Sequence, residues 1–407
     1  MIESMHGDDG SGNAGRLRRD LIAAVQDHDA TAALRVTRAL LDEGADPNTV
    51  VSLPDGQGSI PVLYFPCVSN NEPLARLLLE RGATPTDGES LYHAAQHDHR
   101  DILALLVSFG ADVSRGPSTT GNTPLHFLAS HRATNPIAPQ CVRGMAWLLE
   151  HGAEPNVPLS TIGDGQRPSQ LGETPLHRAA ANGYDHTVLA MLVNAGADMN
   201  APRSDGATPY TLAVRHGNTA GAAWLAAQGA DRSRLTATDR LLSACMTANE
   251  VEARGLLSEH PQLIAQLREG DAGCLLDAFA NNQESAVRLM VSLGWPLTPE
   301  SEWGGTALHW AAWQGQVDLA RVLIEAGAPV NVRDSRYGSS PLAWAAHGSL
   351  HCDRANDTDY PAMVHLLLDA GATRAESFNQ WQESPESMAR PSVVAVLQAR
   401  GFLERPH

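Results

Sequence analysis

The chain has 407 residues, 43% of them hydrophobic, which is enough apolar material to bury a core. Its 29 Lys and Arg residues stand against 46 Asp and Glu residues, giving a formal net charge of -17. Such a chain repels phosphate polyanions, so we exclude nucleic acid as a partner.

Residues 1–16 are polar and rich in glycine, and we predict a flexible N-terminal tail there. This start lacks the apolar core of a signal peptide, and no window of about 18 apolar residues follows that would span a membrane. We therefore expect a cytoplasmic protein without membrane contact.

The five cysteines are Cys67, Cys141, Cys245, Cys274 and Cys352. They are widely spaced, odd in number and without a CxxC pair, so we expect reduced, mostly buried thiols and no cofactor.

From residue 17 onward, a Gly-Ala pair repeatedly ends an apolar helical run. The glycines of these pairs are Gly44, Gly82, Gly110, Gly152, Gly196, Gly229, Gly327 and Gly371. Gly196 and Gly229 are 33 residues apart, and longer intervals elsewhere contain inserted residues. The pattern predicts a repeat of about 33 residues, in which glycine supplies the left-handed residue that ends a helix.

Each repeat begins with a helix-start motif, seen at residues 121–126, 172–177 and 305–309. In the first two, Gly-x-Thr-Pro-Leu-His places a threonine that can cap the free amides and a proline that fits the first helical position. Small Ala pairs follow, as at Ala179-Ala180, and allow neighbouring helices to approach closely. A second helix then carries a leucine-rich run such as residues 364–368.

These elements, in this order, resemble the ankyrin repeat over residues 17–402. The resemblance implies an all-α repeat fold: a solenoid of about ten to eleven helix–turn–helix units with short β-hairpin loops, stabilised by stacking of neighbours. It also implies that His126, His177 and His309 are structural and hydrogen-bond adjacent repeats. A weak repeat near Thr238 suggests a division into two arrays, residues 17–235 and 236–407.

Three stretches rich in Gly, Pro and polar residues lengthen the repeats, at 131–141, 157–171 and 349–361. Since such residues do not continue a helix, we expect loops that leave the stack. Loops on a rigid scaffold are common recognition sites, but surface insertions are also tolerated at little entropic cost. Both interpretations stay open.

The resemblance assigns a groove-facing position to residues flanking the small pair of each first helix. The candidate partner-binding residues are His93, His97, Phe127, His131, Arg178, Arg215, His216, Trp310, Trp313, Trp344 and His347. Trp310 and Trp313 share a helical face, and Trp344 and His347 hold the equivalent positions of the next repeat. We expect an aromatic ladder that serves as a binding hot spot, with a core role for one or more tryptophans as the alternative.

The sequence contains few patterns typical of catalytic or metal sites. His93 and His97 are four residues apart, as two metal-binding imidazoles can be, but no third ligand completes a site, so we expect no metal. Phosphate-binding loops, the GxSxG elbow and the HExxH motif are absent from the sequence, and we predict no catalytic residue.

We therefore predict a protein–protein interaction scaffold that binds a partner with a basic patch through its concave groove and rim loops. The alternative is a small-molecule or enzymatic groove at Trp310, Trp313 and Trp344, with His347 as acid or base and loop 349–361 as a lid. A carboxylate within hydrogen-bonding reach of His347 would favour that alternative.

Overall fold

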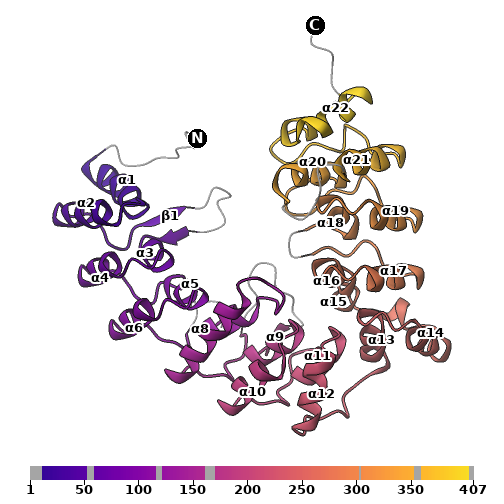
Figure 1. Ribbon diagram of the computed structural model, residues 1–407, viewed down its shortest axis with the longest axis horizontal. Coiled ribbons are helices and arrows are strands. Elements are labelled where there is room, and N and C mark those ends of the chain that lie inside the picture. Colours follow the sequence, from indigo (N-terminus) through magenta and orange to yellow (C-terminus); the bar gives the residue numbers. More distant parts are fainter. Residues whose placement is uncertain are drawn as a thin grey trace. The chain divides into compact units, whose positions relative to one another are not determined.

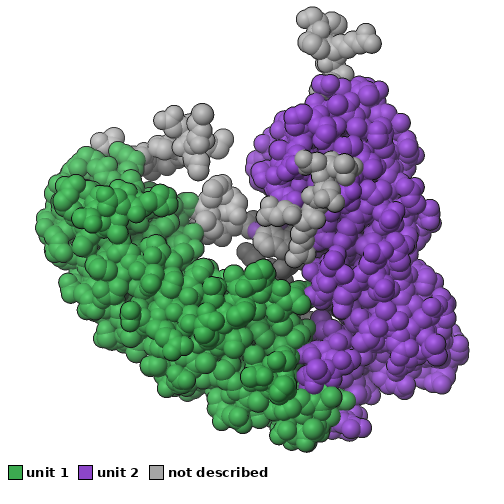
Figure 2. All heavy atoms as spheres, viewed as in Figure 1, with its two compact units in different colours: residues 1–163, 170–210, 223–230 green, residues 164–169, 211–222, 231–407 purple. Residues whose placement is uncertain are grey.

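The computed structural model describes residues 12–52, 59–115, 122–160, 170–301, 304–352 and 359–402, in which short helices are joined by turns (Figure 1). The chain divides into two compact units, coloured separately in Figure 2. The first unit contains the described residues within 12–160, 170–210 and 223–230. The second unit contains residues 211–222 and the described residues from 231 to 402.

The first unit consists of helix pairs and one pair of strands. Its helices are α1 (Asn13–Val25), α2 (Ala30–Asp42), α3 (Tyr64–Val68), α4 (Glu72–Glu80), α5 (Ser90–Gln96), α6 (Arg100–Ser108), α7 (Pro124–Ala129), α8 (Ala138–Glu150), α9 (Pro175–Ala181) and α10 (His186–Asn194). Strands β1 (Val50–Ser52) and β2 (Ser59–Pro61) pair antiparallel, with Val51 opposite Ile60. The first helices pack in series, α3 on α5, α5 on α7 and α7 on α9, while α2, α4 and α6 form a second layer (Figure 1).

The boundary between the units runs through the pair α11 (Pro209–Arg215) and α12 (Thr219–Ala227). The helices of the second unit are α13 (Ala237–Met246), α14 (Glu250–Glu259), η2 (Ile264–Gln266), α15 (Glu269–Ala272), α16 (Cys274–Ala280), α17 (Glu284–Ser292), α18 (Ala307–Trp313), α19 (Val317–Glu325), α20 (Pro341–His351), α21 (Asp359–Asp369), η3 (Pro385–Met388) and α22 (Pro391–Ala399). Again two layers form, α16–α18–α20 and α17–α19–α21–α22, around a common apolar core. The all-α repeat fold is confirmed, while the number of repeats and the expected array boundary at 235/236 stay predictions.

The helix-start motifs act as expected. Thr123, Thr174 and Thr306 cap α7, α9 and α18, and the histidine three residues later completes a capping box. The Nε2 atoms of these histidines lie 3.0, 3.2 and 3.0 Å from the carbonyl oxygens of Glu173, Ala207 and Ser339, respectively, each of which precedes the next first helix. The structural role expected for the three histidines is confirmed.

Asparagine side chains hold successive loops together in both units. Asn48 donates from Nδ2 to the carbonyl of Gly82 at 3.0 Å and accepts at Oδ1 from the amide of Thr84 at 2.8 Å. Asn156 does the same with Gly196 and Asp198, and Asn331 with Gly371 and Thr373. Each of these clips joins the ends of a complete repeat.

Three expected boundaries need correction. Helix α1 begins at Asn13, so residues 13–16 are helical rather than part of a tail, and Arg16 pairs with Asp20 and Glu43. Helix α8 begins at Ala138, because Pro139 falls in the first turn, where a proline leaves no hydrogen bond unmade. Helix α20 continues through Ser349 to His351, so the loop expected to begin at residue 349 starts later. Residues 161–169 and 353–358 of the other insertions lie outside the described part of the chain.

The cysteines are free thiols, as expected. Cys67, Cys141, Cys245 and Cys274 are buried, and Cys352 is partly exposed. Burial raises the pKa of Cys141 to about 11 and that of Cys245 to about 12, which keeps these thiols protonated and unreactive.

Candidate functional site

Four of the candidate residues form one cluster in the second unit. This C-terminal aromatic cluster consists of Trp310 and Trp313 on α18 and Trp344 and His347 on α20. The ring centroid of Trp344 lies 5.9 Å from Trp310 and 6.3 Å from Trp313, and Trp313 lies 5.5 Å from His347. All contacts are edge-to-face, the geometry that aromatic pairs prefer. The stacking of α18 on α20 thus brings together four residues that the sequence analysis singled out.

Trp344 is the fixed base of this cluster. Its side chain is only 9% exposed, and its indole N–H donates to Oδ2 of buried Asp334 at 2.9 Å. The same carboxylate accepts from the backbone amides of Arg336 at 3.0 Å and Ser339 at 2.9 Å. The Trp344 ring also requires glycine at position 305, because a Cβ on Gly305 would lie 2.7 Å from the nearest atom of the indole. Trp344 is therefore held in a fixed position, against which Trp310 and Trp313 pack.

The other cluster members are more accessible. Trp310 and Trp313 are half-buried and His347 is exposed. The indole N–H of Trp310 is buried and has no hydrogen-bond partner among the described residues. Burial on one side and the neighbouring His351 ring, 4.5 Å away, lower the pKa of His347.

Among the described residues, no carboxylate lies within hydrogen-bonding distance of His347. The acid–base pair that would favour an enzymatic groove is therefore not formed by these residues. Part of the proposed lid, residues 353–358, lies outside the described part of the chain.

A second group of aromatic rings crosses three first helices of the first unit. This N-terminal aromatic ladder runs from Tyr64 on α3 to His93 on α5, then to Phe127 on α7 and His131 just after that helix, with centroid distances of 4.9, 5.1 and 5.3 Å. The sequence analysis missed Tyr64, because its repeat lacks the Ala pair. Aligning Leu63-Tyr64 with Leu91-Tyr92 gives Tyr64 the place of Tyr92 and Phe65 the place of His93, so the repeat pattern would have pointed to Phe65 instead.

Hydrogen bonds along the ladder fix the protonation state of His131. Its Nδ1 donates to the carbonyl of Phe127 at 3.2 Å, so its Nε2 accepts from the Gln96 amide at 3.0 Å. The Gln96 carbonyl oxygen in turn accepts from Nδ1 of His93 at 2.8 Å, and Nε2 of His93 lies 3.3 Å from Glu89. Burial lowers the pKa of His131, in keeping with its neutral form.

The candidate arginines lie inside the stack. The side chain of Arg178 is 10% exposed; its Nε donates to Glu173 at 2.6 Å, and its Nη1 donates to Ser130 at 2.7 Å. The Arg215 side chain is equally enclosed and pairs with Asp239, with Asp271 at 3.9 Å. Both guanidinium groups are thus committed to contacts within their own unit. Removing Arg215 would take away this partner of the buried Asp239 carboxylate, whereas Glu173 also pairs with Arg203.

The remaining candidate histidines have local partners. His97 stacks on His99 at 5.4 Å, and burial followed by the neighbouring histidines lowers the pKa of His97. His216 Nδ1 lies 3.3 Å from Asp277. Within the described ranges, no group of three or more His, Cys, Asp or Glu side chains is arranged to hold a metal ion. No helix in those ranges is long and apolar enough to cross a membrane.

Comparison with known proteins assigns the family. A family model described as ankyrin repeats matches residues 67–159, 145–235 and 275–373, together more than half of the chain. The chain belongs to the ankyrin-repeat family. Ankyrin repeats generally mediate protein–protein interaction.

This ankyrin-repeat chain is similar to parts of much longer proteins. It is 28% identical to E3 ubiquitin-protein ligase KEG of Arabidopsis thaliana, over 73% of this chain and 17% of that protein. It is 25% identical to Rabankyrin-5 of Homo sapiens, over 75% of this chain and 26% of that protein. The likeness covers at most about a quarter of either relative.

Proposed function

We propose that this chain is a protein–protein interaction scaffold whose second unit binds a partner through the C-terminal aromatic cluster. The observation that carries the proposal is the contact of half-buried Trp310 and Trp313 with Trp344, which Asp334 holds in place. Tryptophan is enriched among binding hot spots, and a pre-organised side chain loses little entropy when it binds. The cluster lies on the first helices, the face that the family resemblance assigns to the groove.

The unpaired N–H of Trp310 adds to this argument. A buried donor without an acceptor costs about 1–3 kcal/mol. A rotation of the indole that allows the N–H to reach a carbonyl of the partner would recover this energy. Binding and satisfaction of this donor are therefore coupled.

The charge of the chain favours a partner with a basic patch. A net charge of -17 attracts basic surfaces at long range, and the faces of Trp310 and Trp313 suit cationic side chains at short range. The N-terminal aromatic ladder, Tyr64 with His93, Phe127 and His131, is the second surface that we assign to partner contact.

The proposal is tested by affinity capture from native lysate with the wild type and with Trp310→Ala/Trp313→Ala. Recovery of the specific partners should fall by about tenfold or more in the double variant. Trp381→Ala is the matched control, because Trp381 lies in the same unit, is 58% exposed and has its ring contact with Tyr337, outside the cluster. It should retain every partner.

Circular dichroism and thermal unfolding separate binding from folding. The double variant should keep its helical content, with a midpoint only a few degrees lower. Full retention of partners by the double variant, or equal loss in Trp381→Ala, would contradict the proposal.

A further inference from the structure

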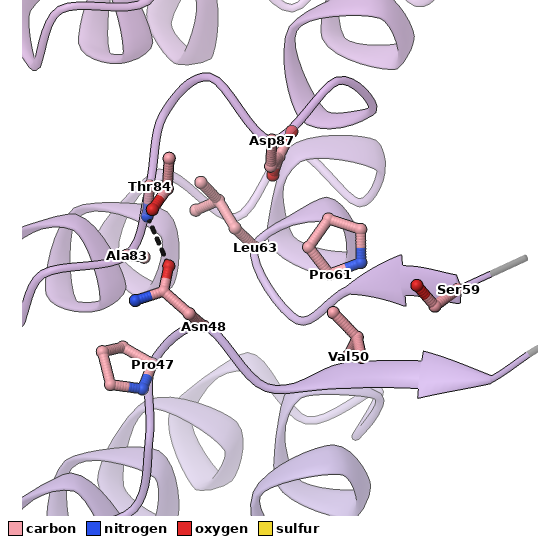
Figure 3. A pocket seen from close by; sticks show the side chains of 9 residues that line it. All are labelled: Pro47, Asn48, Val50, Ser59, Pro61, Leu63, Ala83, Thr84 and Asp87. Atoms are coloured by element: carbon pink, nitrogen blue, oxygen red, sulfur yellow. Dashed lines mark hydrogen bonds between the residues drawn. The ribbon is translucent and has the colours of Figure 1, made fainter. Parts of the chain in front are cut away.

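A small hollow in the first unit is lined by residues that belong to neither aromatic surface. It is lined by Pro47, Asn48, Val50, Ser59, Pro61, Leu63, Ala83, Thr84 and Asp87 and has a volume of about 160 Å³ (Figure 3). These residues come from the segment between α2 and β1, from the first residue of β1, from β2 and the turn that follows it, and from the loop between α4 and α5. Pockets for drug-sized ligands measure about 300–1,000 Å³, so this hollow suits one side chain rather than a metabolite.

The walls of the hollow are held in place before anything binds. The Asn48 clip joins two of its segments, and the bond from Thr84 is drawn in Figure 3. Strand pairing sets Val50 opposite Pro61, and the amide of Val62 donates to the carbonyl of Thr49 at 2.9 Å. A rigid receptor of this kind loses little entropy on binding.

The chemistry of the walls is mostly apolar with one carboxylate. Pro47, Val50, Pro61 and Leu63 present hydrocarbon, and Val50 is 39% exposed although it is apolar. A long methylene chain would cover this surface. The carboxylate belongs to Asp87.

Asp87 is partly buried and lies just before the start of α5. Its Oδ1 accepts from the amides of Glu89 at 2.9 Å and Ser90 at 2.8 Å, and its Oδ2 accepts from the Ser90 hydroxyl at 2.5 Å. Among the described residues, no Lys, Arg or His lies within ion-pairing distance of this carboxylate. Burial raises the pKa of Asp87, although these hydrogen bonds oppose the rise. A cation at this point would relieve the cost of burial.

The hydrogen-bond geometry chooses between the two basic side chains. A carboxylate offers about four acceptor positions, and three donors already occupy Asp87, which leaves about one. A guanidinium binds best as a fork that needs two positions, whereas an ammonium acts as a single point charge. The hollow therefore fits lysine better than arginine.

We propose that this hollow receives one lysine side chain of a protein partner, with its methylenes against Pro47, Val50 and Leu63 and its ammonium on Asp87. The site lies in the other unit from the C-terminal aromatic cluster and does not depend on it. Failure of either proposal leaves the other intact.

The test uses the full chain with labelled Val and Leu methyl groups and Nα-acetyl-lysine amide as the probe. Titration should shift the NMR signals of Val50 and Leu63 saturably, with a Kd on the order of 1 mM, the strength expected for so small a ligand. Nα-acetyl-norleucine amide, which has the stem but no charge, should bind at least about tenfold more weakly.

Asp87→Asn is the decisive variant, because an asparagine still accepts hydrogen bonds from Ser90 and keeps the turn. It should weaken lysine binding by about tenfold or more without changing thermal stability by more than a few degrees. Glu89→Gln, the matched control, removes a neighbouring charge that does not line the hollow and should bind as the wild type does.

Three results would overturn the proposal. Equal binding of the norleucine probe would show an apolar hollow without cation selectivity. Tighter binding of Nα-acetyl-arginine amide would reverse the choice of side chain. Absence of saturable shifts at Val50 and Leu63 would remove the site altogether.

Discussion

Three buried histidines join successive helix pairs, and each uses both ring nitrogens. In α18, Nδ1 of His309 accepts from the amide of Thr306 at 3.1 Å, while Nε2 donates to the carbonyl of Ser339 at 3.0 Å. Only the neutral imidazole with its proton on Nε2 makes both bonds. His126 and His177 have the same arrangement, so a proton added to Nδ1 would face a backbone N–H in all three cases.

This arrangement predicts loss of stability in mild acid. Burial lowers the pKa of His126 to about 3 and those of His177 and His309 to about 4, below the unfolded value of about 6.5. As pH falls from 6.5 toward 4, the unfolded chain binds protons that the folded chain refuses. The free energy of unfolding therefore decreases by about 1.4 kcal/mol per pH unit for each histidine.

The midpoint of thermal unfolding should fall by roughly 5 °C or more between pH 7 and pH 5. His309→Gln should be less stable at pH 7 but show a shallower pH dependence, whereas exposed His28→Gln should keep the full dependence. A midpoint that does not change over this range would refute the neutral-histidine argument.

Residue roles could be predicted where a motif repeats, but not where distant charges meet. The capping histidines follow from the motif alone. Arg178 and Arg215 occupied candidate groove positions, yet Glu173 and Asp239 hold them inside the stack. Asp239 is 24 residues from Arg215 and belongs to another helix pair, so no local pattern indicated this contact.

At the scale of helices, glycine sets how closely neighbours approach. Gly144 of α8 lies against α5, where a Cβ would come within 2.0 Å of the Ala95 carbonyl oxygen. Gly348 of α20 meets the carbonyl of Trp313 in the same way, at 2.5 Å. Backbone atoms cannot move aside as a side-chain tip can, so these contacts depend on the missing Cβ.

Gly144→Ala should therefore destabilise the first unit by about 1–3 kcal/mol, despite the higher helix propensity of alanine. Gly255→Ala in α14 is the matched control, since a Cβ there meets nothing within 4 Å. That variant should be neutral or stabilised by up to about 1 kcal/mol. Denaturant unfolding measures both, and a Gly144→Ala protein as stable as the wild type would disprove the close contact.

Helix starts that carry the threonine and histidine of the repeated motif could be predicted, whereas helix boundaries near insertions could not. Pro139 suggested a loop, but a proline in the first turn is compatible with a helix. The short helices η2, η3 and α15 carry no repeat signal, and their positions depend on packing that the sequence pattern does not encode.

For the whole molecule, the repeat period predicted the layered fold, because each helix pair buries its apolar face only against its neighbours. The candidate binding surface could be predicted only in part from the repeat period. Equivalent positions of successive repeats placed Trp310, Trp313 and Trp344 together, but their depth depends on Asp334 and Gly305, which the periodic pattern does not reveal.

The net charge predicts an effect of salt on the whole chain. A charge of -17 repels itself in the compact state, and salt screens that repulsion over a Debye length of about 10 Å at 0.1 M. Exposed ion pairs such as Arg254 with Glu250 would lose stability in salt, but each contributes only about 0.3–0.5 kcal/mol. The repulsion should dominate.

Raising NaCl from about 10 to about 200 mM at pH 7 should therefore raise the thermal midpoint by a few degrees. Sucrose at equal osmolarity controls for solvent effects and should give a smaller shift at such low concentration. A midpoint that falls with salt would mean that attractive pairs outweigh the net charge.

The asparagine clips have a consequence for how this chain can vary. Asn48, Asn156 and Asn331 each tie the two ends of a repeat together. The repeat of Asn48 contains the strand pair β1–β2, and those of Asn156 and Asn331 contain the stretches 157–171 and 349–361. Because the ends are joined, the intervening chain can grow or shrink without changing the spacing of the flanking helices, at an entropic cost of about 0.6 kcal/mol per doubling of loop length. New surface segments can therefore arise between fixed anchor points, leaving the stacked core undisturbed by insertion or deletion.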